Sequence, residues 1–199
     1  EIYCAPGNGG ISSIAQCVSI DAMNIDGIVE FSKEKGIDLV IVAAENPLAA
    51  GAVDKLEESG IRAFGPDKAA TIIEGSKTFS KNLMKKYGIP TAEYQVFDNS
   101  EKAILYLEEK NTYPIVVKAD GLALGKGVII AQNFEEAKEA VKNIMEEKAF
   151  GDAGNKVVIE EFLVGQEVTV LAFTDGKTVK PMVSSQDHKR AFDNDEGPN

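Results

Sequence analysis

Short apolar runs alternate with amphipathic segments over the first third of the chain. The runs at 2–6, 37–44 and 61–65 are largely apolar, as strands buried in a parallel sheet are. Between them, residues 26–36 show weak helical spacing and end in a glycine, which is typical of a helix C-cap. Residues 47–60 predict a second helix, with proline near its start and glycine at its end.

This β-α-β-α-β succession predicts an α/β domain with an N-terminal open parallel sheet over residues 1–66. Ligands of such sheets lie outside the carboxyl ends of the strands. We therefore expect a ligand site near residues 7–10 and 44–47.

The pattern changes after residue 66. Residues 67–88 have a helical pattern that Gly75 interrupts, so two helices are expected to meet near Lys77. Residues 92–98 predict a strand, and Ser100 is expected to cap the helix that follows it.

The last third combines one strongly periodic helix with strands. Residues 134–147 predict an amphipathic helix, and residues 155–165 predict a strand. Residues 166–185 predict a further pair of strands, folded back at Asp175-Gly176, a dipeptide typical of two-residue hairpin turns.

Composition and charge exclude several classes of protein. With 44% hydrophobic and 27% charged residues the chain resembles an ordinary globular protein, and its net charge of -11 argues against a broad nucleic-acid-binding or acidic-membrane surface. No apolar run approaches the ~18 residues that a membrane helix needs. Cys4 and Cys17 lack partners at metal-ligand spacing, so they are predicted to be free thiols in a reducing cytoplasm.

The stretch "PIVVKADGLALGKGVIIA", residues 114–131, places a glycine-rich loop with lysines between two apolar runs. It is not a Walker A loop: three residues separate Gly121 from Gly125, Gly127 stands where a hydroxyl is needed, and a strand rather than a helix follows. We interpret it as a strand–loop–strand hairpin whose glycines let the backbone approach a phosphate. Lys118, at the end of the first strand, would add a point charge. A tight hairpin with a surface lysine is the alternative.

A second polar group follows about forty residues later, where an apolar strand runs directly into Glu160 and Glu161. The strand edge at 160–163 offers backbone groups to an adenine, and Glu167 offers a carboxylate to a ribose. A strand that ends in solvated glutamates is the alternative interpretation. The order of Lys77, Lys118, the glycine hairpin and Glu160 along the chain favours a nucleotide site.

This order of lysines, glycine hairpin and glutamate resembles the ATP-grasp enzymes. The sequence motifs themselves resemble most closely those of the glycinamide ribonucleotide synthetase family (phosphoribosylamine–glycine ligases). The matching stretches span almost the whole chain: "APGNGG", "FGPDKAATIIEGSK", "YGIPTAEY", "PIVVKADGLALGKGVIIA", "AFGDAGNKVVIEEFLVGQE" and "SSQDHKRAFDNDEGPN". The resemblance implies an ATP-grasp fold, in which the parallel-sheet domain precedes an α+β ATP-grasp region with the antiparallel glycine-rich hairpin. It divides the chain into a partial α/β domain at 1–66, a helical connection at 67–94, a small lid subdomain at 95–160 and the start of a central subdomain at 161–199.

The resemblance also implies a reaction and a set of site residues. The reaction is the ATP-dependent ligation of glycine to 5-phosphoribosylamine in cytoplasmic purine biosynthesis. The residues implied at ATP are Lys77 and Lys118 at the phosphates, Gly125, Lys126 and Gly127 in the covering loop, Glu160, Glu161 and Leu163 near the adenine, and Glu167 at the ribose. Asp187, Lys189 and Arg190 would line the amine and glycine sites as catalytic residues, in a loop with His188, Asp193 and Asp195.

The chain departs from the family pattern in two respects. Ala43, Ala44, Glu45 and Asn46 stand where the family has Gly-Pro-Glu before Pro-Leu, which puts local phosphoribosylamine contacts in question. The family also has a strand before Glu1 and a carboxylate and asparagine that bind Mg²⁺ beyond Asn199. We therefore expect no metal ligands on this chain, and a fragment that is inactive alone. Another ATP-grasp carboxylate–amine ligase and a non-catalytic ATP-binding module remain alternatives.

Overall fold

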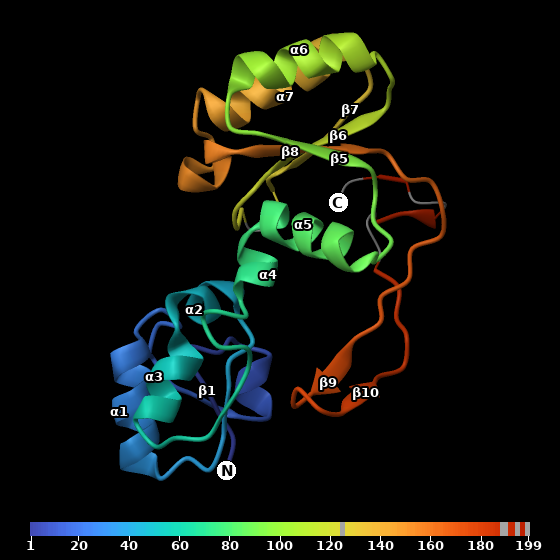
Figure 1. The fold of residues 1–199 in the computed structure, drawn as a ribbon. Helices are drawn as coiled ribbons and strands as arrows, with labels where there is room; N and C mark the ends of the chain where they lie inside the picture. The colour runs from blue at the N-terminus through green and yellow to red at the C-terminus, as the bar shows by residue number, and fades with distance from the viewer. Residues whose placement is uncertain (124–125, 188–190, 194–195, 198–199) are drawn as a thin grey trace. The chain divides into compact units, whose positions relative to one another are not determined.

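The computed structural model describes residues 1–123, 126–187, 191–193 and 196–197 (Figure 1). Contacts within the chain divide it into two compact units, Glu1–Phe162 and Leu163–Asn199, each described below by itself. Gly125, His188, Lys189, Arg190 and Asp195, which the sequence placed at the site, lie outside the described residues.

The strands of the N-terminal part pair in parallel, as predicted, but they form two separate two-stranded sheets instead of the one predicted open sheet. Strand β1 (Tyr3–Cys4) pairs with β2 (Gln16–Cys17), and β3 (Val40–Ile41) pairs with β4 (Ala63–Phe64). Strand β2 was not predicted, because two residues after the 3-10 turn η1 (Ile11–Ser13) carry no periodicity.

Strand β3 is shorter than the predicted run at 37–44. The amide of Ile37 donates to the carbonyl of Ser32 at the end of the preceding helix, so the start of the run closes that helix instead of extending the strand.

Three helices accompany these strands. Helix α1 (Ile25–Lys35) ends at Gly36 with a φ of 62°, which confirms the predicted C-cap. The single helix predicted at 47–60 was wrong: the structure has α2 (Glu45–Ala50) and α3 (Ala52–Glu58), separated at Gly51. Gly51 has a φ of 92°, a conformation that glycine adopts easily and that ends the first helix. Val29, Leu56 and Ile61 form the small core between α1, α3 and the strands.

The helical connection folds as predicted into two helices. Helix α4 (Ile72–Gly75) and α5 (Lys77–Tyr87) meet at Ser76, next to the glycine that interrupts the pattern. Strand β5 (Tyr94–Phe97) follows, and then α6 (Ser100–Lys110). The prediction that Ser100 caps α6 was wrong, because the side chain of Asn99 accepts the hydrogen bond from the Lys102 amide at 2.9 Å. Asn99 is the residue with extended backbone before the helix, as an N-cap requires.

A four-stranded antiparallel sheet in the order β5-β8-β6-β7 forms the centre of the second half of this unit. It contains β6 (Ile115–Ala119), β7 (Val128–Ala131) and β8 (Val157–Glu161). Helix α6 lies beside α7 (Phe134–Met145) on one face of the sheet, and α5 lies on the other (Figure 1). The main core lies beneath α6 and α7. The β6–β7 hairpin confirms the strand–loop–strand interpretation of the glycine-rich stretch.

Among its described residues, the unit Leu163–Asn199 contains the antiparallel hairpin of β9 (Ala172–Thr174) and β10 (Val179–Pro181). The register pairs Thr174 with Val179, so four residues connect the strands and the predicted two-residue turn was wrong. The carboxylate of Asp175 accepts hydrogen bonds from the amides of Lys177 and Thr178, which stabilises the longer turn.

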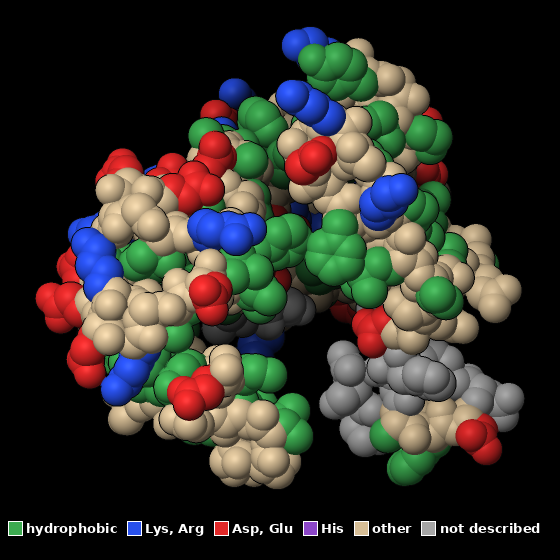
Figure 2. All heavy atoms as spheres, turned by 90° about the horizontal axis from the view of Figure 1, so that it is seen from below, with side chains coloured by type: hydrophobic (Ala, Val, Ile, Leu, Met, Phe, Trp, Pro, Cys, Tyr) green, Lys and Arg blue, Asp and Glu red, His purple; other side chains and the backbone are tan. Residues whose placement is uncertain are grey.

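The surface in Figure 2 shows acidic and basic side chains interspersed with apolar ones. Within the described residues, no helix has the length and apolar character needed to cross a membrane.

Candidate functional site

Strand alternation places Lys118 and Glu160 on the same face of the four-stranded sheet. Alternate residues of β6 and β8 enter the core beneath α6 and α7: Ile115, Val117, Ala119, Val157 and Ile159. Because successive side chains of a strand point to opposite faces, Lys118 and Glu160 face α5. Lys118 pairs with Val158, two residues from Glu160, and a long side chain can span that diagonal.

Two ammonium groups share one oxygen of the Glu160 carboxylate. The Nζ atoms of Lys118 and Lys81 each lie 3.0 Å from Oε2 of Glu160. Glu160 and Lys81 are buried, whereas the side chain of Lys118 retains 26% of its exposure. The sequence assigned Lys118 and Glu160 to different parts of one nucleotide site, and the structure brings them into direct contact; Lys81 was not predicted.

Lys77, the first residue of α5, belongs to the same group of charges. Its Nζ donates to the carbonyl of Gly121 at 3.1 Å, at the root of the glycine-rich loop. Partial burial lowers the pKa of Lys77, and the nearby charge of Lys118 lowers it further, against the opposing influence of Glu74, Asp120 and Glu160. The site therefore holds a partly desolvated cation close to other cations.

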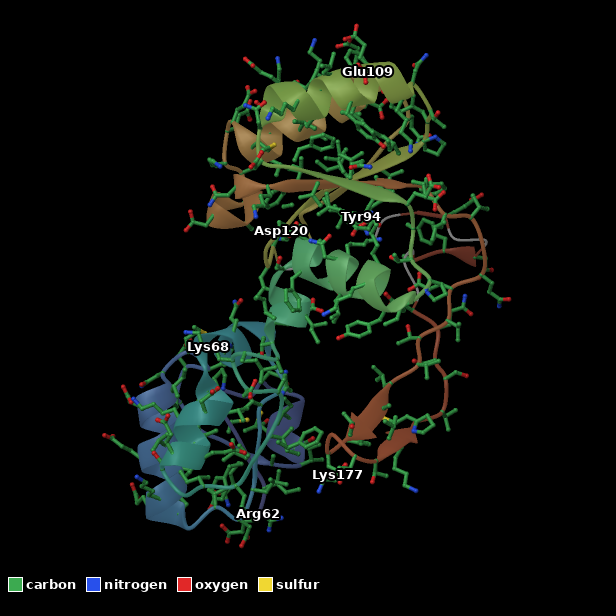
Figure 3. All side chains as sticks on the ribbon, in the orientation of Figure 1. Arg62, Lys68, Tyr94, Glu109, Asp120 and Lys177 are labelled. Atoms are coloured by element: carbon green, nitrogen blue, oxygen red, sulfur yellow. The ribbon has the colours of Figure 1, made fainter. Side chains whose placement is uncertain are left out.

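Asp120 fixes the start of α5 against the root of this loop. Its carboxylate accepts from the Thr78 amide at 2.6 Å and from the Ser76 hydroxyl at 3.2 Å, and its carbonyl accepts from the Lys77 amide at 2.9 Å. A carboxylate at a helix N-terminus is favoured by the unpaired amides and the helix dipole. Figure 3 labels Asp120 where the sheet meets the start of α5, and Tyr94 on β5 above the same helix.

The loop between β6 and β7 needs glycine for reasons of space. The Gly127 carbonyl accepts from the Ala119 amide at 2.8 Å, so the pairing of β6 with β7 extends by one more residue on each strand. A β-carbon on Gly127 would lie 2.7 Å from the Ala123 methyl, and one on Gly121 would lie 2.9 Å from Ala153. Lys126 is exposed at this hairpin.

Glu161 has a partner on the neighbouring strand. Its carboxylate accepts from the amide of Glu93 at 2.8 Å, and its own amide donates to the Glu93 carbonyl at 3.0 Å. These bonds fasten the end of β8 to the residue before β5.

The remaining predicted residues belong to the unit Leu163–Asn199. Leu163 is exposed there, and Glu167 lines a small open cavity together with Gln166, Val168, Ser184, Ser185 and Gln186. Asp187 follows this cavity in the chain. Among the residues that the structure describes, no cluster of three or more His, Cys, Asp or Glu side chains is arranged to hold a metal ion.

Comparison with known protein families accounts for the whole chain. Residues 1–74 match the family described as phosphoribosylglycinamide synthetase, N domain, and residues 75–199 match phosphoribosylglycinamide synthetase, ATP-grasp (A) domain. Proteins named phosphoribosylamine–glycine ligase from Clostridium acetobutylicum and Halalkalibacterium halodurans are 50% and 52% identical over the full 199 residues. These 199 residues cover 48% and 46% of the two relatives, so the chain spans about half their length.

Solved structures agree with the family match. The phosphoribosylamine–glycine ligase of Thermotoga maritima superposes with a TM-score of 0.80 at 31% identity, over 100% of this chain and 47% of that one. A biotin carboxylase from Campylobacter jejuni, solved with β,γ-ATP, shares the fold at 19% identity, with a TM-score of 0.71 over 90% of this chain and 43% of that one. These likenesses confirm the predicted ATP-grasp fold. The chain belongs to the phosphoribosylglycinamide synthetase family.

Proposed function

We propose that the protein carrying this chain ligates glycine to 5-phosphoribosylamine, converting ATP to ADP and phosphate, in the de novo purine pathway of the cytoplasm. The match over all 199 residues to relatives named phosphoribosylamine–glycine ligase supports this reaction. The structural observation that carries the proposal is the pair of Lys81 and Lys118 on one oxygen of Glu160, with Lys77 donating to the Gly121 carbonyl at the root of the glycine-rich loop.

The described residues fit a polyphosphate. The ammonium groups of Lys81 and Lys118 share one carboxylate oxygen of Glu160, and Lys118 has further hydrogens to donate. Burial is the main cause of the lowered pKa of Lys77, so an anionic ligand beside this ammonium group would stabilise its charged form. The bond from Lys77 to the Gly121 carbonyl places the root of the hairpin beside this charge, where amide groups add to the binding of phosphate.

We assign the other predicted residues by the same proposal. Gly125, Lys126 and Gly127 would cover the phosphates, Glu160, Glu161 and Leu163 would lie near the adenine, and Glu167 would accept from the ribose hydroxyls. Asp187, Lys189 and Arg190 would bind glycine and the amine. Since Glu161 already accepts from the Glu93 amide, its contribution to adenine would come from its second oxygen or its backbone.

The chemistry requires an activated carboxyl group. An oxygen of the glycine carboxylate attacks the γ-phosphorus of ATP, ADP leaves, and glycyl phosphate forms. The amine of phosphoribosylamine then attacks the carbonyl carbon, loses a proton and expels inorganic phosphate. Lys77 and Lys118 stabilise charge on the phosphoryl oxygens, and a glycine hairpin over the site excludes water from the acyl phosphate. Mg²⁺, when bound, would supply positive charge that neutralises the transferred phosphoryl group, and the described residues include no His, Cys, Asp or Glu cluster that would hold it.

The decisive experiment measures ADP formation by the protein that carries this chain, with glycine, freshly made phosphoribosylamine and Mg²⁺. The expected result is ADP release that requires both co-substrates, with glycinamide ribonucleotide detected by mass spectrometry. Replacing glycine by alanine or β-alanine, and the amine by ammonia, tests other acid and amine pairs. Turnover with another pair but none with glycine and phosphoribosylamine would contradict the proposed substrates.

A further inference from the structure

Lys81 is a buried cation whose donors are all occupied by the protein. Its Nζ lies 2.7 Å from Oγ1 of Thr91, 3.4 Å from the carbonyl of Ala92 and 3.0 Å from Oε2 of Glu160. It also stands 5.5 Å from the centre of the Tyr94 ring. Since an ammonium group has three hydrogens, these acceptors leave Lys81 none for a ligand.

Lys118 differs in the same surroundings. Within the described residues its Nζ has one acceptor, Oε2 of Glu160, and its side chain is more exposed than that of Lys81. Two of its three hydrogens are therefore available to another anion. The two lysines approach one carboxylate from different elements, Lys81 from α5 and Lys118 from β6.

We propose that Lys81 is the permanent counter-ion of Glu160, and that it thereby releases Lys118 to contact the phosphates of a bound nucleotide. This proposal rests on the nucleotide site of the proposed function, to which it adds Lys81 as a positioning residue. Its physical basis is the cost of an unpaired charge in a buried place. With Lys81 present, Lys118 can turn toward a phosphate while Glu160 remains paired. Without Lys81, the same movement would leave a buried carboxylate alone.

The position of Lys81 makes it suited to this role. Lys77 and Lys81 are four residues apart on α5, so both point to the same side of the helix. The Ser76 cap and the Asp120 contacts fix the start of that helix. The bond to Thr91 and the carbonyl of Ala92 then hold the ammonium group at the segment that leads into β5.

The test compares Lys81→Met with Lys85→Met, which removes an equal charge from an exposed position of the same helix. ATP and adenosine affinities are measured by calorimetry and competition on the protein that carries this chain. Lys81→Met should weaken ATP binding by about 10- to 100-fold, the range for losing a hydrogen bond to a charged group. Adenosine, which has no phosphate for Lys118, should lose little, and Lys85→Met should leave both affinities unchanged. Equal weakening of ATP and adenosine would show that Lys81 only supports the fold and would overturn the proposal.

A second comparison uses Glu160→Gln, which removes the charge that Lys81 compensates. In that background, Lys81→Met should change the ratio of ATP to adenosine affinity by less than about 2-fold, because the two residues act as one pair. If Lys81→Met fails to fold, Lys81→Gln replaces it in the test, because glutamine keeps a hydrogen-bond donor for Thr91. Lys81→Gln should show the same selective loss of ATP affinity. If the parent binds ATP and both Lys81 variants behave like Lys85→Met, this inference fails while the nucleotide site stands. A parent that binds no ATP overturns both.

Discussion

Gly154 lies so close to Ile144 that a β-carbon built on Gly154 would stand 2.1 Å from the Ile144 carbonyl oxygen. Ile144 is fully buried at the end of α7, and Gly154 belongs to the 3-10 turn η2 (Gly151–Asn155) that precedes β8. We predict that Gly154→Ala destabilises the fold by about 1–3 kcal/mol, because backbone must move to admit the methyl group. Urea unfolding followed by circular dichroism measures this change.

Gly75→Ala is the matched control. Gly75 lies in α4, and a β-carbon there would meet nothing within 4 Å. The substitution should be neutral or stabilising by up to about 1 kcal/mol, since alanine is the better helix former. If the two variants unfold at the same urea concentration, the contact between Gly154 and Ile144 tolerates a methyl group and the prediction is wrong.

The cap of α6 gives a second prediction about stability. The Asn99 side chain accepts from the Lys102 amide at 2.9 Å, while Ser100 is the first residue of the helix. Asn99→Ala should cost about 1 kcal/mol of unfolding free energy, the usual effect of losing an N-cap. Ser100→Ala should cost less than about 0.5 kcal/mol, as a surface change does. Thermal unfolding of both variants checks the order, and a larger loss at Ser100 would restore the interpretation made from the sequence.

Much of the fold could be predicted because its signals are local. The apolar runs that became β6 and β8 and the periodicity of α7 are visible in single segments of the sequence. Two errors arose where one residue decides between local alternatives. Gly51 divides α2 from α3 by adopting a φ of 92°, and Asp175 builds a four-residue turn where Asp-Gly favours a two-residue one.

The candidate site was predicted only in part, for a physical reason. Lys118 and Glu160 follow strand runs of recognisable type, so their positions could be anticipated. Lys81 carries no such signal, because a lysine on an amphipathic helix is ordinarily solvated. Its burial depends on Thr91 and Ala92, which lie beyond the end of its helix, and on Glu160, which is far along the chain. The spacing of four residues from Lys77 was the one local indication.

Removal of Lys118 gives the third prediction. Lys118→Ala should weaken ATP binding by about 1.5–3 kcal/mol, the range for a hydrogen bond to a charged group. The fold should be retained, because Glu160 keeps Lys81 as its partner. Calorimetric titration of the protein that carries this chain measures the affinity, with Lys102→Ala, an exposed lysine of α6, as the control. An ATP affinity equal to that of the control would remove Lys118 from the phosphate site.

The pH dependence of stability tests the environment of Lys77. Burial is the main cause of the lowered pKa of this ammonium group, which in the unfolded chain titrates near 10.5. Between the folded and unfolded pKa values, the unfolded chain holds more protons than the folded one. The contribution of Lys77 to the free energy of unfolding therefore rises with pH between its folded pKa and its unfolded pKa of about 10.5. At lower pH the group is charged in both states, and its burial contributes a constant penalty.

Lys77→Met has no ammonium group at this position. Comparing it with the parent therefore isolates the contribution of Lys77 to the pH dependence of the free energy of unfolding. We predict that the free energy of unfolding of the parent, minus that of Lys77→Met, is constant near neutral pH and increases as the pH approaches 10.5. Other lysines and tyrosines titrate in both proteins, so their contributions cancel in the difference. Urea unfolding at a series of pH values from 7 to about 10.5 supplies the measurement. A difference that decreases over the alkaline range would mean that acidic neighbours, with Glu74 and Asp120 foremost, outweigh burial, and that Lys77 has a raised pKa.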